Sequence, residues 1–277
     1  MLKKIFPNKL MNFFPRLKTK YYKFIYPNSN NIIVKHRYFM GANLLVVANE
    51  TVGQQILAGS FESEDIDFFI SSIQANDVFF DIGANVGVFS ILAKSKVPSC
   101  FVHLFEPIPL NCSLIRVSSQ INDMQSIYIN ECVLSDVEKS FSFSKCDDSA
   151  FSSINNTGRS KETKKLTVKS TTIDLYTKKH KIKKIDLIKI DVEGAEKLVL
   201  DGAKDIFRDS NRKPRLMLIE LYDGNLGAFN TSSKEIVNIL KEYNYIPFVL
   251  IEGEKQIFSQ AQHKSIYNIF FELEKNI

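Results

Sequence analysis

The chain has 277 residues, of which 44% are hydrophobic and 24% are charged. These shares are typical of a globular protein, and they exclude both a largely disordered chain and a membrane-embedded one. The length is enough to bury one large core, so we expect a single domain over residues 31–277 behind a short N-terminal extension. No segment contains the roughly 18 consecutive apolar residues of a membrane-spanning helix, and we therefore expect a cytoplasmic protein.

The extension, residues 1–30, is basic and aromatic. Nine basic residues precede the first acid, Glu50, and they exceed the net charge of +5, so the rest of the chain is acidic overall. Two interpretations stay open: residues 1–26 make peripheral contact with an anionic membrane surface, or they form a solvated leader that packs some aromatics on the domain. A nucleic-acid partner is not expected, because such proteins carry their positive charge around the active face.

The remaining sequence alternates between strand and helix patterns. Residues 31–59 predict an N-terminal β-hairpin or meander, and the amphipathic segment 61–74 predicts a helix with acids at its start. Short continuous apolar runs, typical of strands covered on both faces, follow at 77–83, 100–107, 126–134, 185–191 and 214–221. Helical patterns separate most of them, at 86–96, 109–121 and 194–207. This order predicts an α/β fold with a parallel, doubly wound sheet.

Residues 136–184 interrupt this alternation. Alternating polar and apolar positions around a Ser- and Asn-rich stretch predict an inserted β-hairpin, whose polar loop lies over the carboxyl ends of the parallel strands. Long loops at that edge commonly handle substrate. Near the end of the chain, 244–258 and 265–274 are predicted to form an antiparallel pair with its turn at 252–255.

Four carboxylates mark the ends of predicted strands: Asp81, Glu106, Asp191 and Glu220. They are the first candidates for a binding site, because ligands of an open parallel sheet lie beyond the carboxyl ends of the strands. Glu106 follows Asp81 by 25 residues, near the roughly 20-residue offset at which an acid binds ribose hydroxyls in nucleotide-binding units. The alternative for Glu106 is a role at the N-terminus of the next helix.

The turn after the first of these strands has the sequence DIGANVG, residues 81–87. Gly83 and Gly87 would let the backbone approach a ligand and turn sharply into the helix. A dinucleotide-binding turn would have glycine at positions 85 and 88, where this chain has Asn85 and Val88. An acid followed by G-x-x-x-G suits S-adenosylmethionine, because the Asp81 carboxylate can pair with the positive charge of the cofactor's sulfonium and ammonium groups.

Three segments, FFDIGANVGVFSILAK (79–94), LFEPIPLNCSLI (104–115) and IDLIKIDVEGAEKLVLDGA (185–203), together with PRLMLIEL (214–221), resemble the FkbM family of S-adenosylmethionine-dependent O-methyltransferases. The block IKIDVEGAE is the most specific, and the resemblance covers about residues 52–221. It implies a class I methyltransferase (Rossmann-like) fold, in which a seven-stranded sheet is closed by a reversed terminal strand. It also implies methylation of hydroxyls on secondary metabolites, sugars or glycolipids.

Carried onto this chain, the resemblance implies a set of cofactor contacts in three places. The first turn, the end of the second strand with its following helix, and the turn after the third strand would contribute Asp81, Gly83, Ala84, Asn85, Gly87, Glu106, Pro107, Asn111, Val133 and Leu134.

Methyl transfer to an alcohol needs help from the protein, because a neutral hydroxyl is a poor nucleophile. Either a general base takes its proton or a divalent cation such as Mg²⁺ lowers its pKa. We expect Asp191 to be the acceptor-side acid, with Glu193 and Glu220 in support. Asp191 and Glu220 could instead hold the metal through oxygen ligands. For Glu193 and Glu196, the alternative is a role at a helix N-terminus.

The acceptor is expected to be a small molecule or a glycan. Basic residues are frequent in the inserted segment; such a run is usually a solvated face, but if it faced the acceptor, an anionic or lipid-linked substrate would follow. Two other functions stay open. One is methylation of RNA or protein, and the other is a non-catalytic binding module with a vestigial cofactor site.

Overall fold

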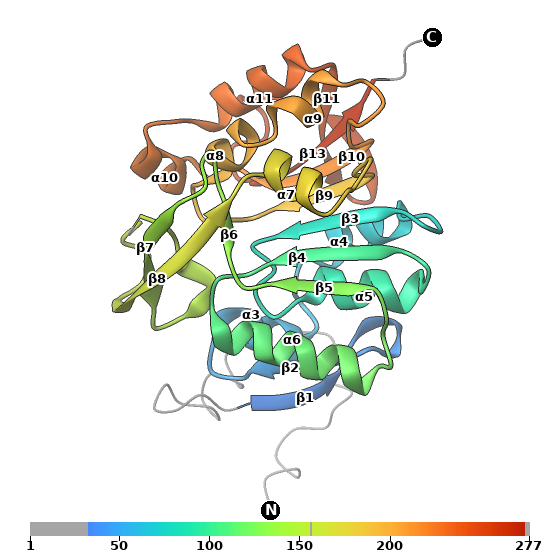
Figure 1. Ribbon diagram of the computed structural model, residues 1–277, viewed down its shortest axis with the longest axis vertical. Coiled ribbons are helices and arrows are strands. Elements are labelled where there is room, and N and C mark those ends of the chain that lie inside the picture. The colour runs from blue at the N-terminus through green and yellow to red at the C-terminus, as the bar shows by residue number, and fades with distance from the viewer. Residues whose placement is uncertain (1–32, 156, 275–277) are drawn as a thin grey trace, which may run out of the picture.

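The computed structural model describes residues 33–155 and 157–274, and an eight-stranded mixed sheet forms its centre (Figure 1). The order across the sheet is β12-β11-β13-β10-β9-β3-β4-β5. The strands are β3 (Val78–Ile82), β4 (Phe101–Phe105), β5 (Ile127–Asn130), β9 (Leu187–Ile190), β10 (Leu216–Glu220), β11 (Tyr245–Ile251), β12 (Glu254–Ile257) and β13 (Asn268–Leu273).

The strand directions confirm the predicted sheet. Strands β5, β4, β3, β9 and β10 are parallel, and β13 inserts antiparallel between β10 and β11. These seven strands are the expected doubly wound sheet with one reversed strand. The eighth, β12, adds to the edge, because the turn at Glu252 and Gly253 joins β11 to β12. The predicted terminal pair is therefore β11 with β13, but the turn at 252–255 does not connect them.

Helices cover both faces of the sheet. They are α3 (Thr51–Ala58), α4 (Ser63–Ser71), α5 (Val88–Lys96), α6 (Pro109–Ile121), α7 (Ile173–Lys179), α8 (Glu196–Asp201), α9 (Lys204–Arg208), α10 (Asp223–Leu226) and α11 (Ser233–Glu242), with single 3₁₀ turns η2 (Phe39–Gly41), η3 (Ser149–Phe151) and η4 (Gly227–Phe229). Successive strand residues point to opposite faces. Accordingly, Phe79 packs in one core with α3, α4 and α5, and Phe80 in the other with α7, α8, α9 and α11.

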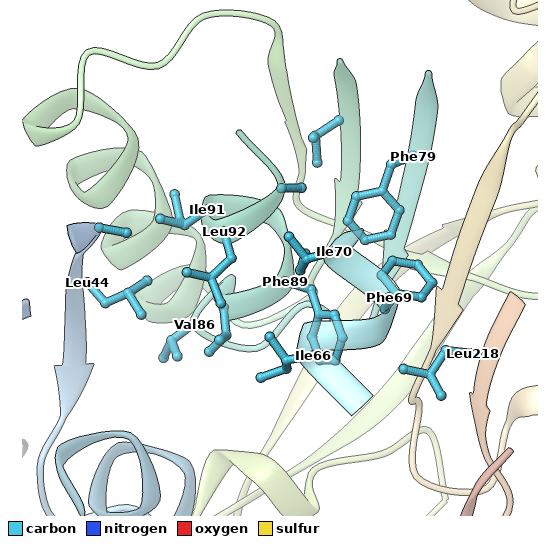
Figure 2. Packing of buried hydrophobic residues seen from close by; sticks show 14 of the residues in the cluster. Leu44, Ile66, Phe69, Ile70, Phe79, Val86, Phe89, Ile91, Leu92 and Leu218 are labelled. Carbon is cyan, nitrogen blue, oxygen red and sulfur yellow. The ribbon is translucent and has the colours of Figure 1, made fainter. Parts of the chain in front are cut away.

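The first core fixes the helices that flank the β3–α5 turn (Figure 2). The ring of Phe69 in α4 lies 5.2 Å from Phe79 in β3 and 5.7 Å from Phe89 in α5, between ring centroids. Ile66 and Ile70 lie on the same side of α4 and are fully buried beside them. Because α4 and α5 both pack on β3, the turn between β3 and α5 is held at the carboxyl edge of the sheet.

The N-terminal region differs in part from its prediction. Strands β1 (Ile33–Arg37) and β2 (Asn43–Val47) form the expected hairpin, but residues 51–58 are the helix α3 and no further strand. Its run of apolar residues is too short for periodicity to separate a helix from a strand. Gly59, with φ of 71°, ends the helix in the left-handed conformation. Residues 1–30, and the predicted membrane contact of residues 1–26, lie outside the described residues.

The insertion contains the predicted hairpin. Strands β7 (Ser140–Cys146) and β8 (Glu162–Thr171) pair antiparallel, and β6 (Val133–Leu134) joins β8 in a small separate sheet. Figure 1 shows this sheet on the side of the molecule where β3 and β4 end. The same range also holds α7, whose first turn is capped by Thr172 through a bond from the Leu175 backbone N–H. Within the described part of the chain, no helix has the length and apolar character needed to cross a bilayer.

Candidate active site

A cavity of about 250 Å³ lies at the carboxyl ends of β3, β4, β9 and β10. Residues of α3 and of the loop between β7 and β8 complete its wall. Most of the site residues predicted from the sequence line it, namely Gly83, Ala84, Asn85, Glu106, Pro107, Val133, Leu134, Asp191, Glu193 and Glu220. The carboxyl edge of the sheet therefore brings residues from five separate segments into one space.

Three predicted cofactor contacts, Asp81, Gly87 and Asn111, are buried and do not line this cavity. Asp81 is 1% exposed, and its Oδ2 accepts a hydrogen bond of 2.6 Å from Ser90 Oγ in α5. The reason is its position inside β3: its side chain points under α5 and not off the end of the strand. Burial raises the pKa of Asp81. The amide of Asn111 donates to Glu106 Oε1 at 3.3 Å, so Asn111 supports a lining residue.

The glycines of the first turn are required by contacts within the protein. Gly83 and Gly87 have φ of 75° and 79°, in the region that favours glycine. A Cβ on Gly83 would lie 1.8 Å from the carbonyl oxygen of Asp191, and one on Gly87 would lie 2.9 Å from Ile115 Cγ1. The sequence interpretation assigned both glycines to ligand approach. The structure adds a packing requirement for each: Gly83 allows the close contact of two strand ends and Gly87 the packing of α5 against α6, while Gly83 also lines the cavity.

Glu106 organises the turn from the neighbouring strand. Its Oε2 accepts from the Asn85 backbone N–H and its Oε1 from the Ile108 N–H, each at 2.9 Å. Burial raises the pKa of Glu106 to about 7, although these bonds act in the opposite direction. The carboxylate therefore fixes the first turn while it borders the cavity. Its bond to the Ile108 N–H, at the start of α6, also gives it the role at the following helix that was considered as the alternative.

Asp191, Glu193 and Glu220 form one acidic cluster, which we name the acid trio. One carboxylate oxygen from each lies within 4.8 Å of the others. Burial and the charge of Asp191 raise the pKa of Glu193 to about 8 and also raise that of Glu220. Glu193 Oε2 accepts from Arg159 Nη1 at 2.8 Å and from the amide of Asn225. The trio thus combines an acid held by two donors with two further carboxylates at strand ends.

The loop that carries the trio is held by buried polar groups. Glu193 and Gly194 have φ of 54° and 107°, a conformation that needs external support at a non-glycine residue. Glu196 Oε1 accepts from the backbone N–H groups of Val192 and Gly194 at 3.2 and 3.1 Å. Ser153 of the insertion donates to the Glu193 carbonyl at 2.9 Å. Glu196 is therefore a loop-supporting residue at the start of α8 and does not line the cavity.

Three charged lining residues were not assigned to the site from the sequence: Lys189, Glu62 and Arg159. Lys189 lies within the apolar run of β9, and the sequence signal that could have pointed to it was the presence of a cation in an otherwise apolar strand. Glu62 counted as one of the acids before α4, but its pKa is raised to about 7 by burial and by the charge of Asp191. Arg159 belongs to the basic insertion, and it is the cation of that segment that reaches the cavity.

The tip of the insertion closes the cavity against α3. Thr51 N donates to Asp148 Oδ2 at 2.8 Å, and Ser149 Oγ donates to Glu50 Oε2. Phe151 of the same tip lines the cavity. The predicted loop over the carboxyl ends of the strands is thus tied down by side-chain bonds to the N-terminal part of the domain.

The residues fit S-adenosylmethionine. Five lining carboxyl groups face two lining cations, so the wall favours a ligand with positive groups; the acids are Glu62, Glu106, Asp191, Glu193 and Glu220. Ile108, Val133 and Phe143 also line the cavity and pack as an apolar cluster, which suits an adenine ring. The side-chain oxygen of Asn85 is buried without a partner among the described residues. The fold and the lining residues are thus those expected of a protein that binds S-adenosylmethionine.

Comparison with known proteins gives the family. Residues 81–247, more than half of the chain, match the methyltransferase FkbM domain, and the chain belongs to this family. It is 33% identical over 64 residues to 31-O-demethyl-FK506 methyltransferase FkbM of Streptomyces tacrolimicus, a match over 23% of this chain and 24% of that protein. It is 25% identical over 143 residues to Methyltransferase 1 of Beauveria bassiana, over 45% and 57% respectively.

The chain thus spans a quarter to somewhat more than half the length of these relatives. Among solved structures, Trm5b of Pyrococcus abyssi matches 88% of this chain and 56% of its own, with 14% identity and a TM-score of 0.45. Precorrin-6y C5,15-methyltransferase of Geobacter metallireducens matches 76% and 85%, with 13% identity and a TM-score of 0.43.

Proposed function

We propose that this protein is an S-adenosylmethionine-dependent methyltransferase that transfers the methyl group to a hydroxyl of a small molecule, with a sugar, glycan or secondary metabolite as the acceptor class. The observation that carries the proposal is the acid trio, which borders the same cavity as the cofactor turn. A hydroxyl acceptor needs a proton acceptor beside it, and the trio supplies one. The relative from Streptomyces tacrolimicus is named for methylation at an oxygen, which agrees with this chemistry.

In this proposal Asp191 takes the hydroxyl proton. When bound, S-adenosylmethionine supplies an electrophilic methyl group, and the protein must orient the acceptor and exclude water. Asp191 is the more accessible acid, with 32% of its side chain exposed, and Lys189 Nζ lies 3.1 Å from its Oδ2. Glu193 is held in place by Arg159 and positions the acceptor beside it. Glu220 completes the acidic wall. Its raised pKa favours the protonated form, so it does not add a second full negative charge beside Asp191.

A divalent cation within the trio is the alternative. The spacing of the three oxygens would allow it. However, Asp191 is paired with Lys189, and Glu193 is paired with Arg159 at 2.8 Å. A cation of the protein already lies beside each of these two acids, which favours the general-base arrangement without metal.

The basic insertion supports an uncharged acceptor. Lys164, Lys165 and Lys169 are exposed on β8, as expected for a solvated face. Arg159 reaches the cavity, but its guanidinium is already paired with Glu193 at 2.8 Å. An acid-rich cavity also disfavours a polyanion such as RNA.

The test is transfer of a deuterated methyl group from S-adenosylmethionine to panels of sugars, glycolipids, hydroxylated metabolites, peptides and RNA. Mass spectrometry finds the product, and NMR locates the methyl. We expect label on an oxygen of a small acceptor. Asp191→Asn should lower the rate by about a hundredfold or more with little change in affinity for S-adenosylhomocysteine, whereas Asp201→Asn, on the surface of α8, should leave both unchanged. Label on a nucleobase or a peptide nitrogen would contradict the proposal.

A further inference from the structure

Lys189 is a buried cation in the cavity wall with unused hydrogen-bonding capacity. Its side chain is 8% exposed, and it lies opposite Asp81 in the register of β9 and β3. Its Nζ donates to the carbonyl oxygen of Gly83 at 3.0 Å and to Asp191 Oδ2 at 3.1 Å. An ammonium has three donors; among the described residues no third oxygen or nitrogen accepts from it, and the ring centroid of Phe89 lies 5.6 Å from Nζ. Since Lys189 lines the cavity, one N–H is available to a ligand.

The surrounding carboxylates keep this ammonium charged. Burial opposes the charged form, but the charges of Asp191, Asp81 and Glu62 outweigh it, and together they raise the pKa of Lys189. A buried cation with a free donor beside a cavity is an anion-binding group, because an ionised partner makes the strongest hydrogen bonds available to it.

The other cation of the cavity wall is already engaged. Arg159 pairs with Glu193 at 2.8 Å, and its guanidinium lies 4.6 Å from the ring of Phe151 and 5.1 Å from that of Tyr222. It comes from the insertion and contacts the acid trio. Lys189 is also paired with an acid of the trio, Asp191, at 3.1 Å, but it additionally donates to the carbonyl of Gly83 in the cofactor turn. Of the two cations, Lys189 is therefore the one placed to bind the cofactor.

We propose that Lys189 binds the carboxylate at the amino-acid end of the cofactor and that Glu62 receives the ammonium beside it. S-adenosylmethionine and S-adenosylhomocysteine each carry a single carboxylate, next to a single ammonium. Lys189 and Glu62 line the same cavity, and the charge of Glu62 acts on the Lys189 ammonium. They therefore offer one group of each sign to that end of the ligand. This inference rests on the cofactor assignment and adds a residue-specific recognition of the amino-acid moiety.

The competing role for Lys189 is purely structural. It could serve only to join the Gly83 carbonyl to Asp191 and to neutralise the buried Asp81. Loss of the lysine would then weaken every ligand of the cavity to the same degree. A ligand that lacks only the carboxylate separates the two roles.

The experiment is isothermal titration of the full chain with S-adenosylhomocysteine and with its decarboxylated analogue, S-adenosyl-3-thiopropylamine. The informative quantity is the ratio of the two affinities within each variant, because a partial folding defect cancels in it. Lys189→Met should weaken S-adenosylhomocysteine binding about tenfold or more. The affinity for the analogue should stay within about threefold of the wild-type value, so the affinity for S-adenosylhomocysteine divided by that for the analogue falls. Arg159→Met is the matched control, and its ratio should stay at the wild-type value.

If Lys189→Met does not fold, Lys189→Arg takes its place, and a displaced guanidinium should lower the ratio in the same direction. Equal weakening of both ligands, or an unchanged ratio, would overturn the inference and leave the cofactor assignment intact. Failure of well-folded wild-type protein to bind either ligand would overturn the cofactor assignment and this inference with it.

Discussion

The raised pKa of Glu193 predicts how the stability of this protein depends on pH. Burial, with the charge of Asp191, raises the pKa of Glu193 from 4.5 to about 8. A carboxyl whose pKa is higher in the folded than in the unfolded state stabilises the fold while it is protonated. That contribution is complete below pH 4.5, and it is lost as the pH rises through about 8. The cofactor-free protein should therefore become less stable between pH 6 and pH 9.

Glu193→Gln isolates this effect. Glutamine keeps the shape and one acceptor oxygen, but it cannot ionise. The full change of pKa corresponds to at most about 5 kcal/mol, at about 1.4 kcal/mol per unit, and the part between pH 6 and pH 8 to at most about 3 kcal/mol. Since 1 kcal/mol shifts the Tm of a domain of this size by about 2 °C or more, the wild type should lose several degrees more than the variant between pH 6 and pH 9. Other acids with a raised pKa, such as Glu220, should leave some dependence of Tm on pH in both the wild type and the variant.

The assay is thermal unfolding followed by circular dichroism over that pH range without ligand. Glu131→Gln is the control, because Glu131 is an exposed acid that pairs with Arg116 on the surface; its curve should follow the wild type. If Glu193→Gln had the same pH slope as the wild type, Glu193 would not be the buried acid that the structure describes, and the reasoning on the acid trio would fail.

Three further outcomes are expected. Gly83→Ala should abolish soluble folded protein or S-adenosylhomocysteine binding, because its Cβ would lie 1.8 Å from the Asp191 carbonyl oxygen. Gly158 has the same φ of 75°, but an added Cβ would meet no atom of the described residues within 4 Å, so Gly158→Ala should cost only about 1 kcal/mol of unfolding free energy. Asp148→Ala should release the insertion tip from Thr51 and increase hydrogen exchange over residues 148–152, with unchanged exchange in α11. Dialysis against EDTA should change neither Tm nor methyl transfer, and recovery of lost activity by Mg²⁺ would establish the metal arrangement.

The meeting of Glu106, Asp191 and Glu220 could be predicted from the sequence because parallel strands end at one edge. Each acid follows or ends a continuous apolar run, so position in the chain is enough to bring them together. The direction of Asp81 could not be derived in the same way. One residue of offset within β3 turns its side chain toward Ser90 of α5, and the end of a strand is the least reliable feature of a sequence pattern.

The place of Lys189 in the site could not be predicted from the sequence for a different reason. Within an apolar run, a lysine is compatible with an edge position or with a side chain that reaches solvent. Its role depends on the pairing of β9 with β3, which places it opposite Asp81, and on Glu62, which comes from a distant segment. These contacts are long-range, and one sequence contains no record of them. The helix α3 was missed because a short apolar run lacks the length that separates the two periodicities.

The first turn shows why a motif and a ligand contact are different claims. DIGANVG suggested a cofactor site, yet Gly83 and Gly87 are required by the Asp191 carbonyl and by Ile115. The turn can hold a cofactor only because β3 lies between β4 and β9, whose ends place Glu106, Lys189 and Asp191 around one cavity. Substitution of either glycine therefore disrupts the scaffold and cannot reveal a contact. The residues that report recognition are those whose side chains face the cavity from rigid strands, and among them Lys189 offers the most specific test, since its proposed partner can be deleted from the ligand.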